Sequence, residues 1–367
     1  MTKTITTVLF IFCICFIAFN CAKEPDLTGI TYNPTPFVLP LRTPSSFPKM
    51  NIPADNPLTV EGIDLGRHLF YDKVLSSNGT MSCGTCHAPA GAFTDNKRTS
   101  PGVLGINGKR SAMSLANIGY INKALFWDGR VKTLEEQALL PIQDSIELHN
   151  SWDQVVSKVK QSATYPTLFR KAFGISKADE ITREMAVKAI AQFERTLISD
   201  NAKVDKVYRH EDFFTDDEFD GLNLFFNTAL APDAQCGHCH SSPFYLTDND
   251  KYFNNGIDSA LTFNDFIDLG RGGFSKVPSD NGKFRIPTLR NVELSAPYMH
   301  DGRFKTLEDV INHYASGGHY SPNVDPFIPS IGKINLSDAQ KRKILAFLKT
   351  MTDTSFIKNP AFQSPYN

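Results

Sequence analysis

The stretch Met81-Ser82-Cys83-Gly84-Thr85-Cys86-His87 organises this chain, and Gln235-Cys236-Gly237-His238-Cys239-His240 repeats its pattern. Covalent c-type haem requires two cysteines separated by two residues and followed at once by histidine, because two thiols add to the vinyl groups and the imidazole binds iron. A thioredoxin-like motif needs no such histidine, and zinc half-sites would leave both histidines unexplained. We therefore predict two covalently bound haems c, held by Cys83, Cys86, His87, Cys236, Cys239 and His240.

The composition is that of an ordinary globular chain. It has 367 residues, a formal net charge of -1 and 41% hydrophobic residues, which suits two domains. The charge balance gives no indication of nucleic-acid binding. The cysteines outside the two motifs are Cys13, Cys15 and Cys21, all near the start, so no pair is left for a structural disulfide.

The N-terminus predicts export. Lys3 precedes an apolar run, Ile5–Phe19, that is too short for a comfortable membrane span. The run ends at Asn20-Cys21, which resembles a bacterial lipobox, although lipoboxes prefer a small residue before the cysteine. We predict a lipoprotein-type signal peptide over residues 1–21, a lipid anchor at Cys21 and a tether over residues 22–56, in the periplasm. Plain signal cleavage and an uncleaved anchor are the alternatives.

Internal repeats indicate duplication. Thr94-Asp95 and Thr247-Asp248 follow the two motifs at an offset of 153, which is also the offset of the motifs themselves. A longer match relates Asp128–Glu135 (DGRVKTLE) to Asp301–Glu308 (DGRFKTLE) at an offset of 173. In each copy the threonine can cap a helix, with an acidic residue three positions on. The two helices are expected in corresponding positions of two haem domains.

Helical patterns dominate and strand patterns are scarce. Thr182–Ile198 is amphipathic, a Ser-x-x-Gln capping box at Ser337 starts the last helix, and the polar stretch Ser199–Thr215 is the candidate boundary. We predict a mainly α protein of two c-type cytochrome domains related by duplication, each around one haem. Their expected ranges are 57–205 and 206–355, with a tail over 356–367.

The two copies differ where an iron ligand would stand. At the offset of 173, Tyr314 corresponds to Pro141. Tyrosinate can ligate iron and proline cannot, so the first iron is predicted to be open and the second to be closed by Tyr314. Met299 and His313 compete for that position, and His313 is the more plausible of the two.

Five stretches carry a resemblance to a known family: Cys83–His87, Phe126–Arg130, Glu136-Gln137, Pro287–Asn291 and Pro297–Gly302. Together they resemble the bacterial di-haem cytochrome c peroxidases, a family that includes the MauG-type enzymes. The resemblance runs in the family's order from about Leu58 to Thr352.

The resemblance implies roles for residues of the first domain. That domain becomes the peroxidatic one, with His87 as the proximal ligand, Gln137 as the distal glutamine and Glu147 as the acid–base group that moves a proton between peroxide oxygens. Trp127 matches the family's tryptophan between the haems. Without the resemblance, Glu147 would be interpreted as a solvated carboxylate and Trp127 as a core aromatic. His149 is close in sequence and could assist.

The resemblance also implies a calcium ion between the haems, held by oxygens of a set suited to a hard cation. The ligands would be the Asn117 side chain and the backbone carbonyls of Ser295 and Pro297. For Arg290 and His300 we prefer a structural or haem-carboxylate-binding role to direct ligation of iron.

Two departures bear on the subtype. Many of these peroxidases carry a blocking histidine between the first haem motif and Arg110, whereas here no histidine lies between His87 and His149. We therefore expect a five-coordinate first iron. At the second haem the family's peroxidases usually place methionine and the MauG-type members tyrosine, and this chain has Tyr314.

The leading hypothesis is a di-haem peroxidase that reduces hydrogen peroxide to water with electrons from a small cytochrome c or cupredoxin. The first alternative is a MauG-like oxidase that uses peroxide-derived ferryl haem to oxidise a protein or organic substrate. The second is a non-enzymatic electron carrier or sensor, which would need two six-coordinate irons. Members of the family are often dimers, so a homodimer is a further expectation, with membrane contact only through the lipid anchor.

Overall fold

The computed structural model describes residues 26–121, 123–226, 234–244 and 251–366. The predicted signal peptide and lipid anchor at residues 1–21 lie outside the described residues, and so does the Thr247-Asp248 pair. In the described part of the chain, no helix is both long and apolar enough to cross a membrane.

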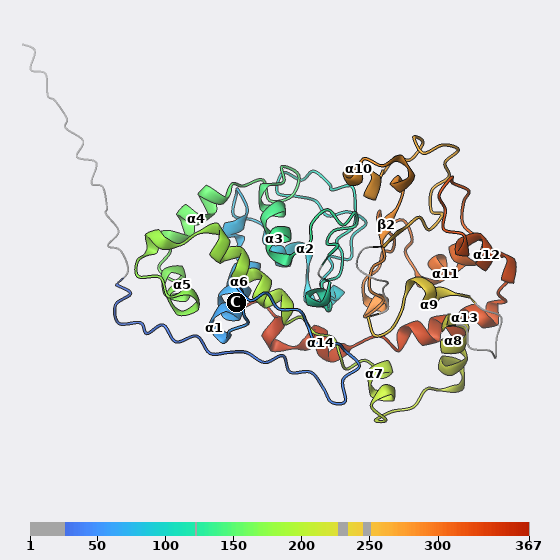
Figure 1. The fold of residues 1–367 in the computed structure, drawn as a ribbon, viewed down its shortest axis with the longest axis horizontal. Coiled ribbons are helices and arrows are strands. Elements are labelled where there is room, and N and C mark those ends of the chain that lie inside the picture. The colour runs from blue at the N-terminus through green and yellow to red at the C-terminus, as the bar shows by residue number, and fades with distance from the viewer. Residues whose placement is uncertain (1–25, 122, 227–233, 245–250, 367) are drawn as a thin grey trace, which may run out of the picture.

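The described chain is mainly helical, as the sequence predicted (Figure 1). Two short strands, β1 (Tyr252–Phe253) and β2 (Phe284–Arg285), pair antiparallel. The α-helices are α1 (Val60–Tyr71), α2 (Cys83–Cys86), α3 (Leu134–Gln143), α4 (Trp152–Lys160), α5 (Tyr165–Phe173), α6 (Arg183–Arg195), α7 (Lys203–Tyr208), α8 (Asp216–Phe226), α9 (Cys236–Cys239), α10 (Arg271–Ser275), α11 (Leu307–Ala315), α12 (Phe327–Ile334), α13 (Asp338–Lys349) and α14 (Thr354–Lys358).

The duplication is visible in how the helices cross. In the first half α1 packs against α6, and in the second half α8 packs against α13. A Cβ atom on Gly66 of α1 would lie 1.9 Å from the carbonyl oxygen of Ala189, and one on Gly221 of α8 would lie 2.0 Å from that of Lys343. Only glycine permits this close approach, so both halves build their cores on the same kind of crossing.

The predicted capping boxes are confirmed. The Thr133 hydroxyl accepts from the backbone N–H of Glu136 at the start of α3, and Thr306 accepts from Asp309 in the same way at the start of α11. Ser337 caps α13 likewise. These local hydrogen bonds fix corresponding helices at corresponding places, which agrees with two c-type cytochrome domains.

Each half has its own cluster of buried apolar side chains. The first cluster includes side chains of α1, α4, α5 and α6, and the second includes side chains of α8, α11 and α13. Val204 of α7 packs against the second cluster, and its backbone N–H donates to Thr350 O over 3.0 Å. The domain boundary predicted between residues 205 and 206 falls inside α7 and stays a prediction.

Both terminal segments pack against the body of the protein. In the described part of the expected tether, Leu27, Phe47 and Met50 are buried. From the expected tail, Phe356 and Phe362 belong to the first cluster, and the C-terminus lies beside α1 in Figure 1. Apolar side chains in both segments are the physical reason, because burying them stabilises an ordered path along the surface.

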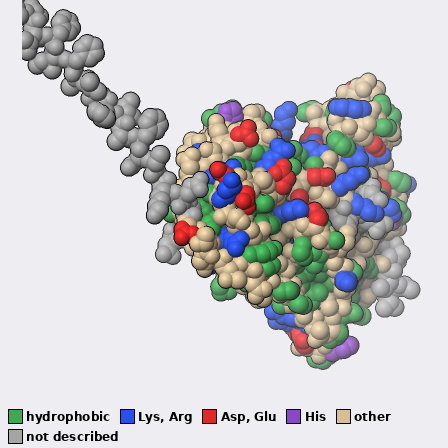
Figure 2. Space-filling view, turned by 60° about the vertical axis from the view of Figure 1, so that its left-hand side comes forward, with side chains coloured by type: hydrophobic (Ala, Val, Ile, Leu, Met, Phe, Trp, Pro, Cys, Tyr) green, Lys and Arg blue, Asp and Glu red, His purple; other side chains and the backbone are tan. Residues whose placement is uncertain are grey.

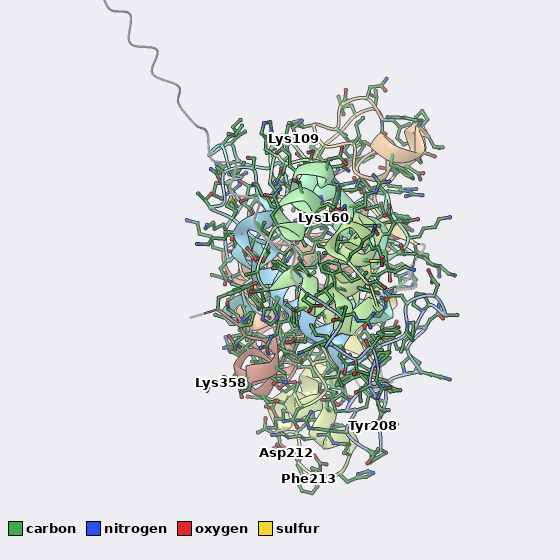
Figure 3. The ribbon with its side chains drawn as sticks, turned by 90° about the vertical axis from the view of Figure 1, so that its left-hand side faces the viewer. Lys109, Lys160, Tyr208, Asp212, Phe213 and Lys358 are labelled. Atoms are coloured by element: carbon green, nitrogen blue, oxygen red, sulfur yellow. The ribbon has the colours of Figure 1, made fainter. Side chains whose placement is uncertain are left out.

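The surface carries mixed charge, as the net charge of -1 predicts. Figure 2 shows positive and negative side chains interspersed on one face of the molecule. At the lower end of the view in Figure 3, Tyr208, Asp212 and Phe213 mark the connection from α7 to α8, and the Phe213 residue is 83% exposed.

Candidate di-haem site

The first haem motif forms the short helix α2, and its geometry prepares His87 to bind iron. The ring Nδ1 of His87 lies 2.9 Å from the carbonyl oxygen of Phe93, which can only accept, so Nδ1 carries the proton and Nε2 is left for a metal. Phe93 adopts φ 63°, a left-handed conformation that aims this carbonyl at the ring. Burial lowers the pKa of His87, which favours the neutral form that binds metals.

The second motif forms α9 in the same way. The backbone N–H of His240 donates to Cys236 O over 2.9 Å, as that of His87 donates to Cys83 O over 3.0 Å. The four motif cysteines, Cys83, Cys86, Cys236 and Cys239, are not paired with one another in disulfides. Covalent haem attachment uses both thiols of each motif, so the two motifs fit this chemistry.

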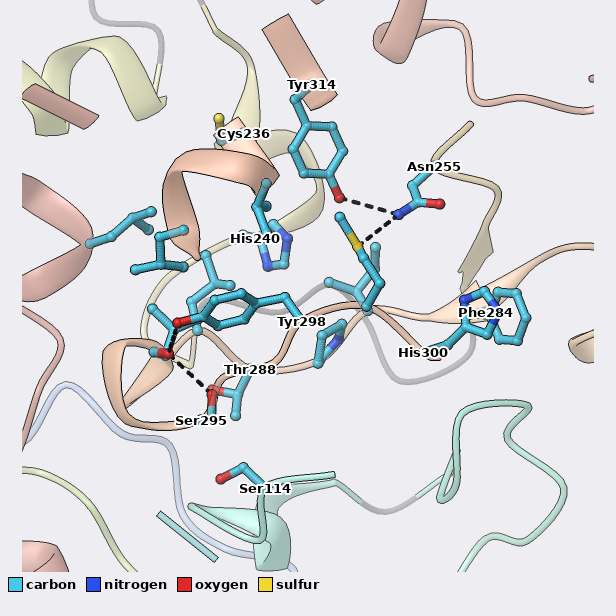
Figure 4. Close-up of a pocket in the computed structure, with 18 of the residues that line it drawn as sticks. Ser114, Cys236, His240, Asn255, Phe284, Thr288, Ser295, Tyr298, His300 and Tyr314 are labelled. Carbon is cyan, nitrogen blue, oxygen red and sulfur yellow. Dashed lines mark hydrogen bonds between the residues drawn. The ribbon is translucent and has the colours of Figure 1, made fainter. Parts of the chain in front are cut away.

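His240 lines a cavity at the junction of the two domains (Figure 4). The first domain contributes Ser111–Ser114 and Trp127 to its wall. The second domain contributes Tyr314 and many apolar side chains, so the wall suits a large, mostly apolar macrocycle.

Tyr314 and Met299 both line this cavity, and Figure 4 shows Tyr314 beside Asn255. The side-chain nitrogen of Asn255 donates to the Tyr314 hydroxyl over 3.5 Å and to the Met299 sulfur over 3.3 Å. Burial raises the pKa of Tyr314 to about 12, although the Asn255 hydrogen bond opposes the rise. The phenol is therefore neutral, and it must lose its proton to bind iron as tyrosinate.

The structure reverses the predicted order of the two competitors of Tyr314. The Nε2 atom of His313 lies 3.0 Å from the backbone oxygen of Asn255, and the ring packs against Phe304 instead of lining the cavity. Neighbouring residues of a helix point about 100° apart, so α11 cannot aim both His313 and Tyr314 at one place. Met299 reaches the cavity because its φ of 73° turns the chain there.

Gln137 lies on α3, and Glu147 lies in the turn that follows this helix. Among the described residues, the carboxamide of Gln137 has no hydrogen-bond partner. Much of the surface of Glu147 is exposed, yet the carboxyl sits in a crowded recess where desolvation raises its pKa, with Asp144 adding to the rise and Arg130 opposing it.

The turn that holds Glu147 packs against the loop after the first motif, and Ser100 of that loop forms a hydrogen bond with the Cys86 thiol. Burial is the main cause of the raised pKa of the Cys83 and Cys86 thiols, and the charge of Glu147 contributes to both rises. The backbone oxygen of Glu147 accepts from Val103 N over 2.8 Å, so the loop that lacks the blocking histidine packs against this turn. The structure thus brings Glu147, the loop and the haem attachment site together.

Trp127 is tied to the second domain through Ser111. Its indole Nε1 donates to Ser111 O over 2.9 Å, and the backbone N–H of Ser111 donates to His300 O over 2.8 Å. His300 stacks on Phe284 in the cavity wall, with ring centroids 3.9 Å apart. His300 therefore has a packing role here.

Arg290 is held by several contacts within the protein, and its predicted haem-binding role stays a prediction. Its guanidinium pairs with Asp205 over 2.7 Å, donates twice to Pro243 O over 2.7 and 2.9 Å, and lies over the ring of Phe47. These contacts connect Arg290 to α7 and to the segment that contains Pro243. Sequence reasoning singled it out because it stands inside a family motif.

The Asn117 side chain is hydrogen-bonded to a backbone segment. Both ends of its amide group bind the backbone of Ser199. Nδ2 donates to Ser199 O over 3.1 Å, and Ser199 N donates to Oδ1 over 2.9 Å. In the second domain, Oδ1 of Asn291 accepts from Asp353 N over 2.7 Å. The two asparagines therefore hold the backbone in a similar way in the two domains. Ser295 and Pro297 line the cavity, and the calcium site stays a prediction without a free Asn117 amide.

Comparison with known proteins follows this geometry. Residues 60–212 match the family model described as di-haem cytochrome c peroxidase. The methylamine utilization protein MauG of Methylophilus methylotrophus is 34% identical over 315 residues, which is 84% of this chain and 87% of that protein. The chain belongs to the di-haem cytochrome c peroxidase and MauG family. The cytochrome c551 peroxidase of Nitrosomonas europaea is 33% identical over 310 residues, 83% of this chain and 84% of the relative.

Solved structures agree with this family. A MauG-like protein associated with microbial copper homeostasis superposes with a TM-score of 0.78 at 34% identity, covering 88% of this chain and 98% of that one. The diheme peroxidase BthA from Burkholderia thailandensis E264 shares the fold, with a TM-score of 0.67 at 22% identity over 84% of this chain and 91% of its own. Family members carry two haems c, and the paired cysteines of each motif, the proton on Nδ1 of His87 and the mostly apolar lining of the cavity fit that cofactor.

Proposed function

We propose that this family member reduces hydrogen peroxide to water at the haem of the first domain, with electrons delivered through the second haem from a small cytochrome c or cupredoxin. The observation that carries the proposal is the packing of the Glu147 turn against a loop without histidine, in which Val103 N donates to Glu147 O and Ser100 forms a hydrogen bond with the Cys86 thiol. When bound, the haem supplies an iron that binds peroxide and passes on electrons. Overall, two electrons and two protons convert one peroxide into two waters.

Glu147 is suited to move the proton in this reaction. Its raised pKa brings the carboxyl closer to neutral pH, where a group can both accept and return a proton. It would take the proton from the oxygen that approaches the iron and give it to the oxygen that leaves as water. Gln137, whose carboxamide is free among the described residues, can donate an N–H group that orients the peroxide.

Trp127 supports the electron route of the proposal. It lines the cavity that holds His240, and Ser111 ties it to the second domain. An oxidisable ring at this place shortens the distance that an electron must travel between the haems. The redox partner would dock on the second domain, because electrons enter there in this scheme.

A second candidate is the MauG-like oxidation of a protein or organic substrate, and Tyr314 in the cavity of His240 is the observation that favours it. An anionic oxygen ligand stabilises oxidised iron, whereas a thioether favours ferrous iron. A tyrosinate-bound second haem would therefore share oxidising equivalents more readily than it would pass electrons inward.

The test is turnover of peroxide by the haem-loaded protein with a reduced cytochrome c and, separately, a reduced cupredoxin. We expect rapid turnover that Glu147→Gln lowers by about 10²- to 10⁴-fold. The matched control is Glu184→Gln, because Glu184 is an exposed carboxylate on α6 paired with Arg183, and this variant should keep full activity. Silence with both donors, while peroxide still changes the haem spectrum, would instead support the MauG-like alternative.

The proposal includes export and a lipid anchor at Cys21, which the N-terminal pattern favours. Mass spectrometry of the mature N-terminus from membranes should find a lipidated cysteine. Cys21→Ala should release the protein into the soluble periplasm, whereas unchanged membrane attachment would argue against the anchor.

A further inference from the structure

Arg285 is a buried cation that has no charged partner among the described residues. It lies on β2, is 5% exposed, and donates its backbone N–H to Trp127 O over 2.8 Å. Burial lowers the pKa of Arg285 to about 10, so the guanidinium is still positively charged at neutral pH. A charge in such surroundings destabilises the fold unless another group compensates it.

The acceptors that surround the guanidinium are neutral. Nε lies 3.4 Å from Phe126 O, Nη1 lies 3.5 Å from Ile286 O, and Nη2 lies 3.3 Å from the Met113 sulfur. The two contacts to oxygen are at the long end for a hydrogen bond. Within the described part of the chain, no carboxylate forms an ion pair with Arg285.

Arg110 and Arg303 differ from Arg285, because both form ion pairs with carboxylates. Arg110 forms a bidentate pair with Asp268 and a further pair with Asp128. Arg303 pairs with Asp258 and Asp301. The isolation of Arg285 is therefore specific to its position in the cavity wall.

Arg285 lines the same cavity as His240, Tyr314 and Trp127. Its partner Met113 lines that cavity too, and the Met113 backbone also interacts with the ring of His87. The cation therefore lines the cavity that contains His240, and its backbone is hydrogen-bonded to that of Trp127. An anion bound in the cavity would compensate its charge.

Haem c carries two carboxylates, and it is the anion that this cavity is built to hold. We propose that Arg285 is the counter-ion of a carboxylate of the haem held by His240, and that its charge helps to set the midpoint potential of that haem. A neighbouring cation favours the ferrous state, because it compensates the electron that the haem gains. This assignment rests on the haem of the second domain and not on the proposed substrate, so the turnover assay does not decide it.

The experiment is a spectroelectrochemical titration of both haems in the haem-loaded wild type and three variants. In Arg285→Gln we expect the second haem to shift at least about tenfold toward ferric, which is about 59 mV lower in midpoint potential for one electron. Arg285→Lys keeps the charge and should stay closer to wild type. Lys283→Gln is the matched control, because Lys283 is two residues away, pairs with Asp280 and should change neither potential.

Three outcomes would overturn the proposal: unchanged potentials in Arg285→Gln, a shift confined to the first haem, or an equal shift in Lys283→Gln. If Arg285→Gln fails to fold or to take up haem, the wild type and Arg285→Lys decide. Resonance Raman spectra should then show different haem-carboxylate bending bands, since a guanidinium and an ammonium bind a carboxylate differently. Identical bands in these two proteins would contradict the assignment.

Discussion

The indole N–H of Trp127 donates to the carbonyl oxygen of Ser111 over 2.9 Å. Ser111 in turn donates through its backbone N–H to His300 O over 2.8 Å and through its hydroxyl to Met299 O over 3.0 Å. One serine therefore fixes the ring of the first domain against the wall of the cavity in the second. A ring held in this way keeps a constant position between two redox centres.

Replacing Trp127 by phenylalanine removes the oxidisable indole and its hydrogen bond and keeps most of the packing. We expect electron transfer from the second to the first haem to slow by about tenfold or more, which corresponds to about 1.4 kcal/mol of barrier. The reaction of the first haem with peroxide should keep its rate. Stopped-flow absorption, which follows the two haems separately, makes this comparison.

Trp152 provides the control, since the chain has two tryptophans. Trp152 lies in the first apolar cluster and donates to Leu139 O over 3.1 Å. Trp152→Phe should lose about 1 kcal/mol of stability with its hydrogen bond and leave the transfer rate unchanged. Equal slowing in both variants would mean that the effect is structural.

The variant Tyr314→Phe tests whether Tyr314 is a ligand of the second haem iron. Because Asn255 contacts both Tyr314 and Met299, removal of the phenol hydroxyl leaves the Met299 sulfur as the next ligand in reach. We expect a higher midpoint potential in Tyr314→Phe, since a thioether favours ferrous iron. Cyanide should bind the second haem readily only in the double variant Met299→Leu/Tyr314→Phe. A second haem with an unchanged spectrum in Tyr314→Phe would exclude tyrosine as its ligand.

Local and covalent features of this molecule could be predicted from the sequence. The haem motifs follow from the chemistry of attachment, and the capping boxes at Thr133 and Thr306 involve residues three positions apart. The constant offsets between the repeated stretches indicated a duplication, and the duplication predicted that α3 and α11 correspond. The sequences around Asn117 and Asn291 are also similar, and this similarity could have predicted that the two asparagines have the same structural role.

Contacts between distant segments could not be predicted in this way. Arg290 stands inside a family motif, yet Asp205 of α7 holds it, and the cation in the cavity is Arg285, five residues earlier. Met299 enters the cavity through a left-handed turn that no periodicity reveals. These details depend on which segments meet after folding, and spacing along the chain does not determine that.

Glu194 predicts a pH dependence of stability. It is 4% exposed on α6, and within the described residues its Oε2 atom has no hydrogen-bond partner. Burial raises its pKa from 4.5 to about 8, with Arg195 opposing the rise and Glu135 adding to it. The folded protein therefore holds this proton at a pH where the unfolded chain has lost it.

The sign follows from that difference in bound protons. The contribution of Glu194 is fully present below about pH 4.5 and is lost as the pH rises toward about 8, at about 1.4 kcal/mol per pH unit. Glu194→Gln should flatten this decline in the free energy of unfolding, measured by urea titration across the range. Glu184→Gln, on the exposed face of the same helix, should keep it. The interpretation fails if both variants retain the wild-type slope.

The C-terminal segment makes the last prediction. Phe362 is 6% exposed, packs on Phe356 with ring centroids 5.5 Å apart, and its carbonyl oxygen accepts from the Tyr71 hydroxyl over 2.5 Å. Phe362→Ala should therefore lower the free energy of unfolding by about 3–5 kcal/mol, as expected for a buried phenylalanine. Phe213→Ala, at an 83% exposed position, should change it by less than about 0.5 kcal/mol. Denaturant unfolding of the haem-loaded protein separates the two, and equal small losses would show that the segment contributes nothing to the first domain.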